Sequence, residues 1–591
     1  MALPTLAHKA AWRVPRRVLL DLALASAIGL GALALDLYQL GAASIWFDEA
    51  FSFDVVNRSF PAMWQDIWGK APNMELYYLL LYAWLHVAAL FGWHPTALVL
   101  RLPSAVCAAL SAVALFALGR RFWGRTAGVV GALLYLLNPL QLYYAQQARA
   151  YSLELLLDIV SWFALLAALR AAEHRRRWWW AGYVGATTLA FYAHVYTALL
   201  VAAQLVALGT LLALPTPWRA RVRTALRPLF ASLMLIGILI VPLALVSRNG
   251  GPAGWVPAAT GQSLYNLAVR SISDGSLLYF GAMGAAAVLT ILAALAFCLP
   301  LAAPRPPADP TGTSPPSVTA LASPTATRSP AAPAATRSPA APSASFVTSL
   351  YHVRDRLLVG DHEWTLPSAL ALACWLLVPV ALSFAVTQRA INLHLFLDRY
   401  LVVIVPALCL LIGAGVGVIL PRWPWARAGV ALGLVLVAAR LVPAYYPQAD
   451  TRSFHAATAW LEQRYQPGDG LACYPSFWCR VPMTFELTAA AGPAQFSPAS
   501  PGATYDTQTL AAYAATHPRV ILIVAIFNPR PIHPTTASAP PMGALSQWMR
   551  AHYHLVDQMV TLHPNYQDTG QDILTGVSVA IYATGGPPGG A

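Results

Sequence analysis

The chain has 591 residues, of which 58% are hydrophobic and only 10% are charged, and its formal net charge is +13. Soluble domains carry about 25% charged residues, so this composition excludes a single soluble globule and indicates a multi-spanning membrane protein with soluble attachments. A positive net charge can indicate nucleic-acid binding. Here the arginines cluster in short loops between apolar segments, which is the pattern that orients a membrane protein, so we expect no nucleic-acid partner.

The N-terminus carries basic residues between Lys9 and Arg17 and then enters a long apolar run without a cleavage site. We therefore predict a retained first span, a cytoplasmic N-terminus and a multi-pass protein of the cell (plasma) membrane. A span needs about 20 apolar residues. The spans are predicted near residues 18–40, 101–118, 126–144, 150–170, 179–195, 197–214, 228–247, 277–300, 366–387, 400–420 and 425–445.

The apolar segment 75–91 is also long enough to suggest a span. If it crossed the membrane, every arginine-rich loop up to Arg227 would face outside, whereas without it all the basic loops share the cytoplasmic side. We therefore predict a helix that lies in the membrane interface or packs against the bundle, a position that suits Tyr82 and Trp84. The alternative is an ordinary span and one miscounted neighbour.

Residues 301–345 form a Pro/Ala/Ser/Thr-rich tract whose composition predicts a disordered cytoplasmic linker. It separates an N-terminal transmembrane module, 1–300, which includes the first outer loop 41–100, from C-terminal transmembrane helices at 346–446. Residues 447–591 are less apolar, and the side count places them outside as a small α/β domain. Its helices are predicted at 453–465 and 544–555, and its strands at 520–528 and 577–583.

Two of the six cysteines, Cys473 and Cys479, lie in this polar C-terminal part. They could form a disulfide if the domain faces an oxidising compartment. No cysteine spacing suggests a zinc site. The other four lie in apolar segments and are expected to be small packing residues: Cys107, Cys298, Cys374 and Cys409.

Two adjacent carboxylates, Asp48 and Glu49, follow the first span directly in the string Trp46-Phe47-Asp48-Glu49. Charged groups at a membrane surface are costly if they only pack, which favours a function for the pair. A carboxylate in a partly apolar cleft can act as a general base on an incoming hydroxyl. The alternative is a solvated pair of loop acids.

A second polar cluster follows Pro139 at the outer end of the third span and contains Gln147, Arg149, Tyr151 and Glu154. The planar fork of Arg149 is suited to bind a phosphate. Glu154 lies about one helical turn further on and could face the same cleft. The alternative is a structural ion pair between Arg149 and Glu154.

Three more residues stand at outer span ends. Because arginines concentrate on the cytoplasmic side, Arg399 and Arg101 are unexpected there, and they favour a site for an anionic lipid head group. His194 could be a metal ligand or a proton shuttle, but a histidine without a defined partner is more often structural.

The chain resembles the bacterial membrane glycosyltransferases related to protein O-mannosyltransferases and the lipid A aminoarabinose transferase, which are family-39-like enzymes of the GT-C fold. The resemblance rests on six strings that keep the family's order. They are W-F-D-E-A at 46–50, L-Y-Y-L-L-L at 76–81, R-L-P-S-A at 101–105, Y-Y-A-Q-Q-A-R-A-Y-S-L at 143–153, Y-A-H at 192–194 and D-R-Y at 398–400.

This resemblance implies a GT-C bundle with juxtamembrane helices in the first outer loop, a polyprenyl-phosphate-linked hexosyl or pentosyl donor, and inversion at the anomeric carbon. It implies that Asp48 is the catalytic base and that Glu49 orients it or the acceptor. The residues expected to bind the donor phosphate are Arg149, Arg399, Arg101, Tyr151 and Tyr400. Other expected contacts to donor or acceptor are Glu154, Gln147, His194, Tyr77, Tyr78 and Glu75.

Two departures from the family pattern bear on these expectations. The family often has His-Pro-Pro before the Leu-Tyr-Tyr string, whereas this chain has Asn73-Met74-Glu75, so Glu75 could partly replace that histidine. The resemblance also fades after about residue 445, so the outer domain says little about the acceptor, which is a protein, a lipid or a glycan. No metal is required by the mechanism, and a divalent cation at the acids stays open.

Two other functions fit a bundle with outside arginines. A transporter or flippase of lipid-linked sugars would show an internal repeat of spans, which is not evident, although Asp158 inside the fourth span would suit transport. A polymerase or ligase of lipid-linked oligosaccharides would use a pyrophosphate-linked donor.

Overall fold

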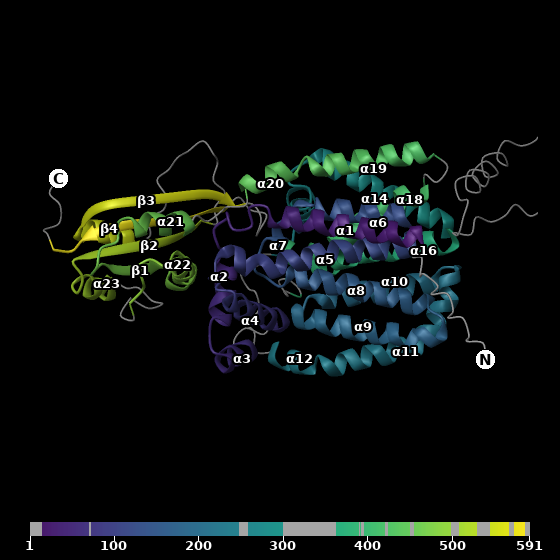
Figure 1. Cartoon of the computed structure of the whole chain (residues 1–591), viewed down its shortest axis with the longest axis horizontal. Coiled ribbons are helices and arrows are strands. Elements are labelled where there is room, and N and C mark those ends of the chain that lie inside the picture. The colour runs from purple at the N-terminus through teal and green to yellow at the C-terminus, as the bar shows by residue number, and fades with distance from the viewer. Residues whose placement is uncertain are drawn as a thin grey trace, which may run out of the picture.

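The computed structural model describes residues 15–69, 73–247, 258–298, 362–388, 391, 395–419, 423–448, 454–497, 507–528, 544–565 and 573–585. The described helices form an elongated bundle, and a smaller α/β domain lies beyond one end of it (Figure 1). We call this the domain-side end. The predicted fold class, a mostly helical membrane bundle with a C-terminal α/β domain, is confirmed. The linker predicted at 301–345 lies outside the described residues.

Eight of the described helical segments are long and apolar enough to cross a membrane, and one bent pair makes a possible ninth. The eight are α1 (Arg16–Leu37), α5 (Ala97–Trp123), α8 (Tyr151–Arg170), α11 (Pro217–Leu239), α14 (Leu277–Cys298), α16 (His362–Val386), the run from α17 (Asp398–Leu401) through η2 (Val402–Ile404) into α18 (Val405–Ile419), and the run of α19 (Pro424–Ala439) and α20 (Val442–Gln448).

The bent pair is α6 (Arg125–Leu136) with α7 (Pro139–Ala145), which meet at 65°. The bend has a local cause, because Pro139 starts a new helix whose first turn is capped by the Asn138 side chain. Two more helices, α9 (Glu173–Ala193) and α10 (Thr197–Ala213), run beside α8 (Figure 1). All the predicted spans are therefore helical, although α9 begins with charged residues and α10 has only 17 residues.

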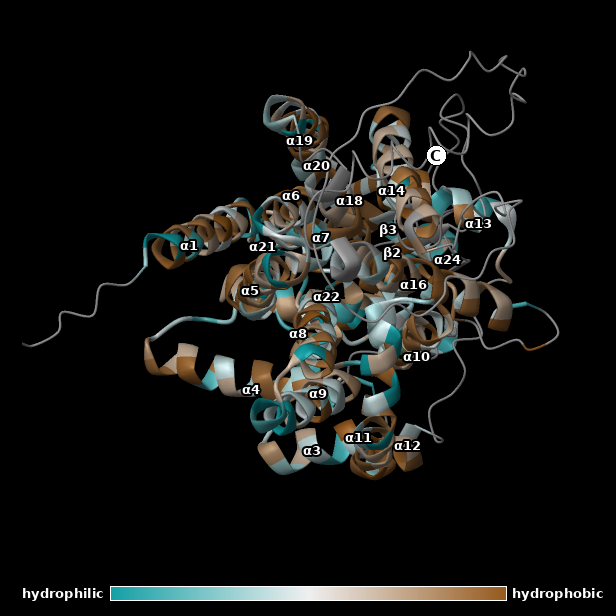
Figure 2. Cartoon of the chain, turned by 90° about the vertical axis from the view of Figure 1, so that its right-hand side faces the viewer, coloured by the Kyte–Doolittle hydropathy of each residue, from teal (hydrophilic) through white to brown (hydrophobic). Residues whose placement is uncertain are grey.

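The first loop carries three helices between α1 and α5, namely α2 (Phe47–Val56), α3 (Phe60–Gly69) and α4 (Glu75–Leu90). They lie at the domain-side end (Figure 1). Figure 2 views the spans end-on and shows α4 from the side, so α4 runs crosswise to them. This arrangement agrees with the prediction that 75–91 does not run with the spans. The opposite end holds the arginine-rich turns, where Asp21 of α1 pairs with Arg120 and Arg125.

Helices α5, α6 and α18 approach one another closely at glycines. A Cβ atom on Gly119 would lie 2.6 Å from the Cα of Gly128, and one on Gly413 would lie 2.5 Å from the carbonyl oxygen of Ala127. Small residues allow such close backbone contact between helices in a membrane, where van der Waals packing drives association. These glycines therefore fix the position of α18 against α6.

Between α11 and α14 the described chain forms α12 (Val241–Ser247), α13 (Gly261–Tyr265) and the π-helix η1 (Asn266–Ser271). The C-terminal domain is a four-stranded sheet of order β1-β2-β4-β3, with β1 (Gly470–Tyr474) parallel to β2 (Arg519–Asn528), and with β4 (Ile573–Ala583) antiparallel to β2 and to β3 (His554–Asn565).

Helices cover both faces of this sheet. Alternate residues of β2 point to opposite faces, so they pack with different helices. Ile521 and Ile523 pack with α21 (Phe454–Glu462) and α22 (Ser476–Ala490), whereas Val520 and Leu522 pack with α23 (Thr507–Ala514) and α24 (Ala544–His552). The Cys473–Cys479 disulfide is present and ties the end of β1 to the first turn of α22, as predicted.

Candidate functional site

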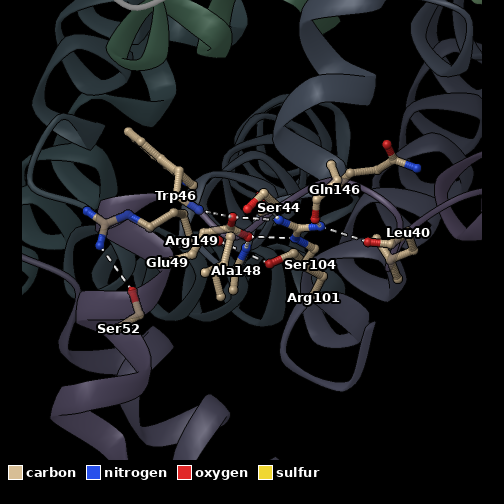
Figure 3. Close-up of polar contacts among 12 residues, drawn as sticks. Leu40, Ser44, Trp46, Glu49, Ser52, Arg101, Ser104, Gln146, Ala148 and Arg149 are labelled. Carbon is tan, nitrogen blue, oxygen red and sulfur yellow. Dashed lines mark hydrogen bonds and ion pairs between the residues drawn. The ribbon is translucent and has the colours of Figure 1, made fainter. Parts of the chain in front are cut away.

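The loop that leads from α1 into α2 has no regular structure, so its backbone groups are satisfied by buried side chains. Arg101 of α5 is 3% exposed and donates all five of its N–H groups, three to loop carbonyls and two to the carboxylate of Glu49. The carboxylate of Glu49 also accepts from the backbone N–H groups of Ala148 and Trp46, at 2.8 and 3.3 Å (Figure 3).

This pair corrects two expectations. Arg101 has no N–H group left for a donor phosphate, because Glu49 and the carbonyls of Leu40, Ala43 and Ser44 accept all of them. Glu49 is 1% exposed and accepts four hydrogen bonds, so it is in no position to act on an acceptor. Both residues fix the start of α2, which carries Asp48, so the other expected role of Glu49, the orientation of Asp48, stays a prediction.

Asp48 stands beside this pair and has different partners. Its Oδ2 accepts a hydrogen bond from Nη1 of Arg399 at 2.8 Å and lies 4.0 Å from Nη2 of Arg149. Nη1 of Arg149 donates to the Asp48 carbonyl and to the Ser52 hydroxyl, so this arginine is held on α2 (Figure 3). The Asp48 side chain is 21% exposed, which leaves the carboxylate accessible.

Three segments that are distant in sequence thus meet at one carboxylate: α2, the turn between α7 and α8, and the start of α17. Both arginine side chains are mostly buried, with exposed fractions of 11% for Arg149 and 10% for Arg399. The Nε atom of Arg149 is buried and has no hydrogen-bond partner among the described residues. This cluster therefore sets two guanidinium groups against the one carboxylate of Asp48, an excess of positive charge that suits an anionic group.

Aromatic rings and a histidine surround Arg399 on its other side. The ring of His194 lies 5.6 Å from that of Tyr151 and 5.7 Å from that of Tyr400. His194 Nδ1 accepts from the Tyr196 backbone N–H and lies 3.9 Å from Oε1 of Glu154.

The tyrosines of α4 differ in their contacts. Tyr77 is fully buried, and its hydroxyl lies 3.0 Å from that of Ser104, which donates to the Arg149 carbonyl, so Tyr77 supports the site indirectly. Tyr78 interacts directly with the Arg149 side chain. Neither carboxyl oxygen of Glu75 has a partner from another described residue, and burial raises the pKa of this acid to about 7.

A large apolar groove lies beside η2 and α18, the helical run that continues from α17. It has a volume of about 660 Å³ and is lined by side chains of η1, α14, α16 and α18, almost all of them apolar. Its lining includes Ile404, five residues after Arg399, and Ile272, which follows η1. The hydroxyl of Ser271 donates to Asp398, which joins η1 to the segment that carries Arg399.

The structure therefore brings Asp48, Arg149, Arg399, Tyr400 and Tyr78 together, with Tyr151, His194 and Glu154 behind them. Gln147 lies by the Glu49–Arg101 pair, in the lining of a small cavity of about 30 Å³. Within the described ranges, no three His, Cys, Asp or Glu side chains converge on a metal-sized space. Because Glu49 is fully engaged, a divalent cation would find only Asp48 at these acids, which does not fit a metal site.

Sequence reasoning missed the residues that hold the site from behind. Ser52 and Ser104 bind Arg149, and Glu486 of the C-terminal domain accepts from the Ile45 backbone N–H at 3.3 Å. Ser104 stood in the quoted Arg-Leu-Pro-Ser-Ala string, which was a usable signal. Nothing in the sequence pairs Glu486 with residue 45.

Residues 79–245 match the sequence model of a family described as dolichyl-phosphate-mannose-protein mannosyltransferase. The resemblance predicted from the motifs is confirmed over this segment, which contains the strings around Arg149 and His194. No curated protein sequence matches the chain.

Among solved structures, the chain is similar to ArnT from Cupriavidus metallidurans bound to undecaprenyl phosphate, at 12% identity and a TM-score of 0.44 over 97% of this chain and 99% of that one. It is similar to the Archaeoglobus fulgidus oligosaccharyltransferase in complex with Zn and sulfate, at 12% identity and a TM-score of 0.47 over 89% and 71% of the two chains. The same organism's AglB, in complex with an inhibitory peptide and a dolichol-phosphate, gives 11% identity and a TM-score of 0.45 over 92% and 73%.

Proposed function

We propose that the chain is a membrane glycosyltransferase that moves a sugar from a polyprenyl-phosphate carrier to an acceptor hydroxyl or amine. The observation that carries the proposal is the accessible carboxylate of Asp48, 2.8 Å from Arg399 and 4.0 Å from Arg149. A base next to two phosphate-binding cations is what such a transfer needs. The family match over residues 79–245 supports a lipid-phosphate sugar as donor.

In this mechanism the donor phosphate binds Arg149 and Arg399 and competes with Asp48 for Arg399. Asp48 then takes the proton of the acceptor hydroxyl while the acceptor oxygen attacks the anomeric carbon from the face opposite the phosphate. The bond between that carbon and the phosphate oxygen breaks with inversion, and the leaving phosphate keeps the electron pair. The arginines stabilise its charge, and the bound geometry supplies much of the remaining rate.

The apolar groove beside η2 and α18 supports a lipid carrier, because a prenyl chain needs an apolar surface to bind. The reaction is proposed for the extracytoplasmic side. The arginine-rich turns lie opposite the domain-side end, and the disulfide in the C-terminal domain is typical of an oxidising compartment.

The test is transfer of label from a radiolabelled polyprenyl-phosphate sugar in membranes that contain the full chain. Asp48→Asn is expected to lower transfer by about 100- to 10,000-fold, the usual contribution of a general base. The matched control is Asp54→Asn on the same helix, an exposed acid paired with Arg58, which should keep wild-type transfer. Undiminished transfer by Asp48→Asn would remove the base from the mechanism, and carrier translocation without transfer would favour a flippase.

A further inference from the structure

The C-terminal domain contacts the membrane bundle at the loop that positions Asp48. Ser44 and Ile45, in the loop before α2, both donate to Oε1 of Glu486 on α22, at 3.5 and 3.3 Å. The backbone N–H of His455, on α21, donates to the Ser44 hydroxyl at 2.9 Å. Ser44 is thus held by two helices of a domain more than 400 residues away in sequence.

The same loop is held from the membrane side by Arg101, which donates to the carbonyl of Ser44 at 3.0 Å. The loop therefore lies between an arginine of α5 and a glutamate of α22. Both side chains bond to loop backbone groups that no helix or strand satisfies. Ile45 is fully buried, so loss of Glu486 would leave its N–H group without an acceptor and without water. Glu486 is itself 5% exposed, which strengthens its hydrogen bonds.

Packing continues this contact along α2. The Phe47 ring lies 4.1 Å from that of Trp478 and the Phe53 ring lies 5.0 Å from that of Phe485, so two aromatic pairs join α2 to α22. Phe47 immediately precedes Asp48. A shift of α22 would therefore move the residue next to the proposed base.

We propose that Glu486 is a positioning residue, through which the C-terminal domain holds the 40–46 loop and sets the placement of Asp48 against the two arginines. This inference rests on the proposed function for its effect on transfer. Glu486 does not touch Asp48, Arg149 or Arg399 in any described contact, so it acts on the placement of the base and not on donor binding.

The test compares Glu486→Ala and Glu486→Gln in the full chain, reconstituted in lipid. Glu486→Ala is expected to lower kcat by roughly 10- to 100-fold, as small misplacements of a reacting group do, with an unchanged KM for the polyprenyl-phosphate sugar. Glu486→Gln keeps an oxygen that accepts from Ile45 and should retain most of the activity. Asp557→Ala, on β3 of the same domain, removes an equal charge from an exposed pair with Arg464 and should behave as wild type.

A second measurement does not depend on transfer. Hydrogen–deuterium exchange of the 40–46 loop should rise in Glu486→Ala and stay near the wild-type level in Glu486→Gln. If Glu486→Ala folds poorly, Ser44→Ala removes the hydroxyl that contacts Glu486 and His455 but keeps the Ile45 N–H bond to Glu486, so it should raise exchange by a smaller amount. Unchanged exchange in both alanine variants overturns the proposal.

The two proposals can be distinguished. Full activity in Glu486→Ala, alongside the loss in Asp48→Asn, overturns the positioning role and leaves the glycosyltransferase intact. Equal losses in the alanine and glutamine variants also overturn it, because hydrogen-bond acceptance by residue 486 would then not be the cause. If hydrogen–deuterium exchange follows the prediction but the wild type transfers no sugar, Glu486 does hold the 40–46 loop and the proposed glycosyltransferase function is wrong.

Discussion

Replacing Glu49 with glutamine is expected to destabilise the membrane bundle rather than to remove a catalytic group. The Glu49 carboxylate accepts four hydrogen bonds, two from Arg101 and one each from Ala148 and Trp46. A glutamine has one acceptor oxygen, so its amide group would face donors at the other position. The buried guanidinium would also lose its counter-ion.

Breaking a buried ion pair by removing one partner costs about 3–5 kcal/mol. Because both side chains are 3% exposed or less, water cannot replace the lost contacts. The measurement is the apparent melting temperature in detergent, with transfer assayed well below it. Asp54→Asn is the control, since its pair with Arg58 is exposed and worth less than about 1 kcal/mol. A Glu49→Gln protein that melts like wild type but has lost transfer would refute this reasoning and favour a direct role for Glu49 in the reaction.

Three further outcomes are expected. Arg399→Gln should lower kcat/KM for the donor by about 10- to 100-fold, because a hydrogen bond to a charged group contributes about 1.5–3 kcal/mol, and unchanged donor kinetics would argue against phosphate binding there. Burial raises the pKa of Glu75 to about 7, so the protonated acid is favoured in the folded state, and its stabilising effect is complete below pH 4.5 and lost as the pH rises through 7. The melting temperature of the wild type should therefore fall relative to that of Glu75→Gln between pH 5 and pH 8. Parallel plots of melting temperature against pH for the two proteins would contradict this. Reducing the Cys473–Cys479 disulfide should lower the stability of the C-terminal domain by about 2 kcal/mol and also lower transfer, whereas the double serine variant should not respond to reductant.

Much of the fold could be predicted because apolar length and arginine placement are local signals. The side count and the aromatic residues predicted that 75–91 lies in the interface or packs against the bundle, and α4 lies crosswise to the spans (Figure 2). In the C-terminal domain, the buried strands β2 and β4 were predicted from their apolar runs. Both edge strands were missed: β1 has only five residues, and the described residues of β3 mostly alternate between exposed and half-buried positions, which is a weak pattern.

Site residues were predictable as a set but not in their individual roles. Asp48, Arg149 and Arg399 do converge, as their positions at span ends suggested. The adjacent acids Asp48 and Glu49 look equivalent in sequence, yet α2 turns one toward the arginines and the other into the bundle. Only the three-dimensional contact with Arg101, 52 residues away, separates a buried structural acid from an accessible one.

The glycine contacts among α5, α6 and α18 have a consequence for the chemistry. Gly413 lies 14 residues after Arg399 on nearly continuous helix, or about 20 Å at 1.5 Å per residue. A single methyl group added there would meet the Ala127 backbone, and the whole segment would have to tilt or slide to accommodate it. Substitutions deep in the lipid-embedded interior can therefore misalign a guanidinium at the surface, and variants that impair transfer need not map near the substrate.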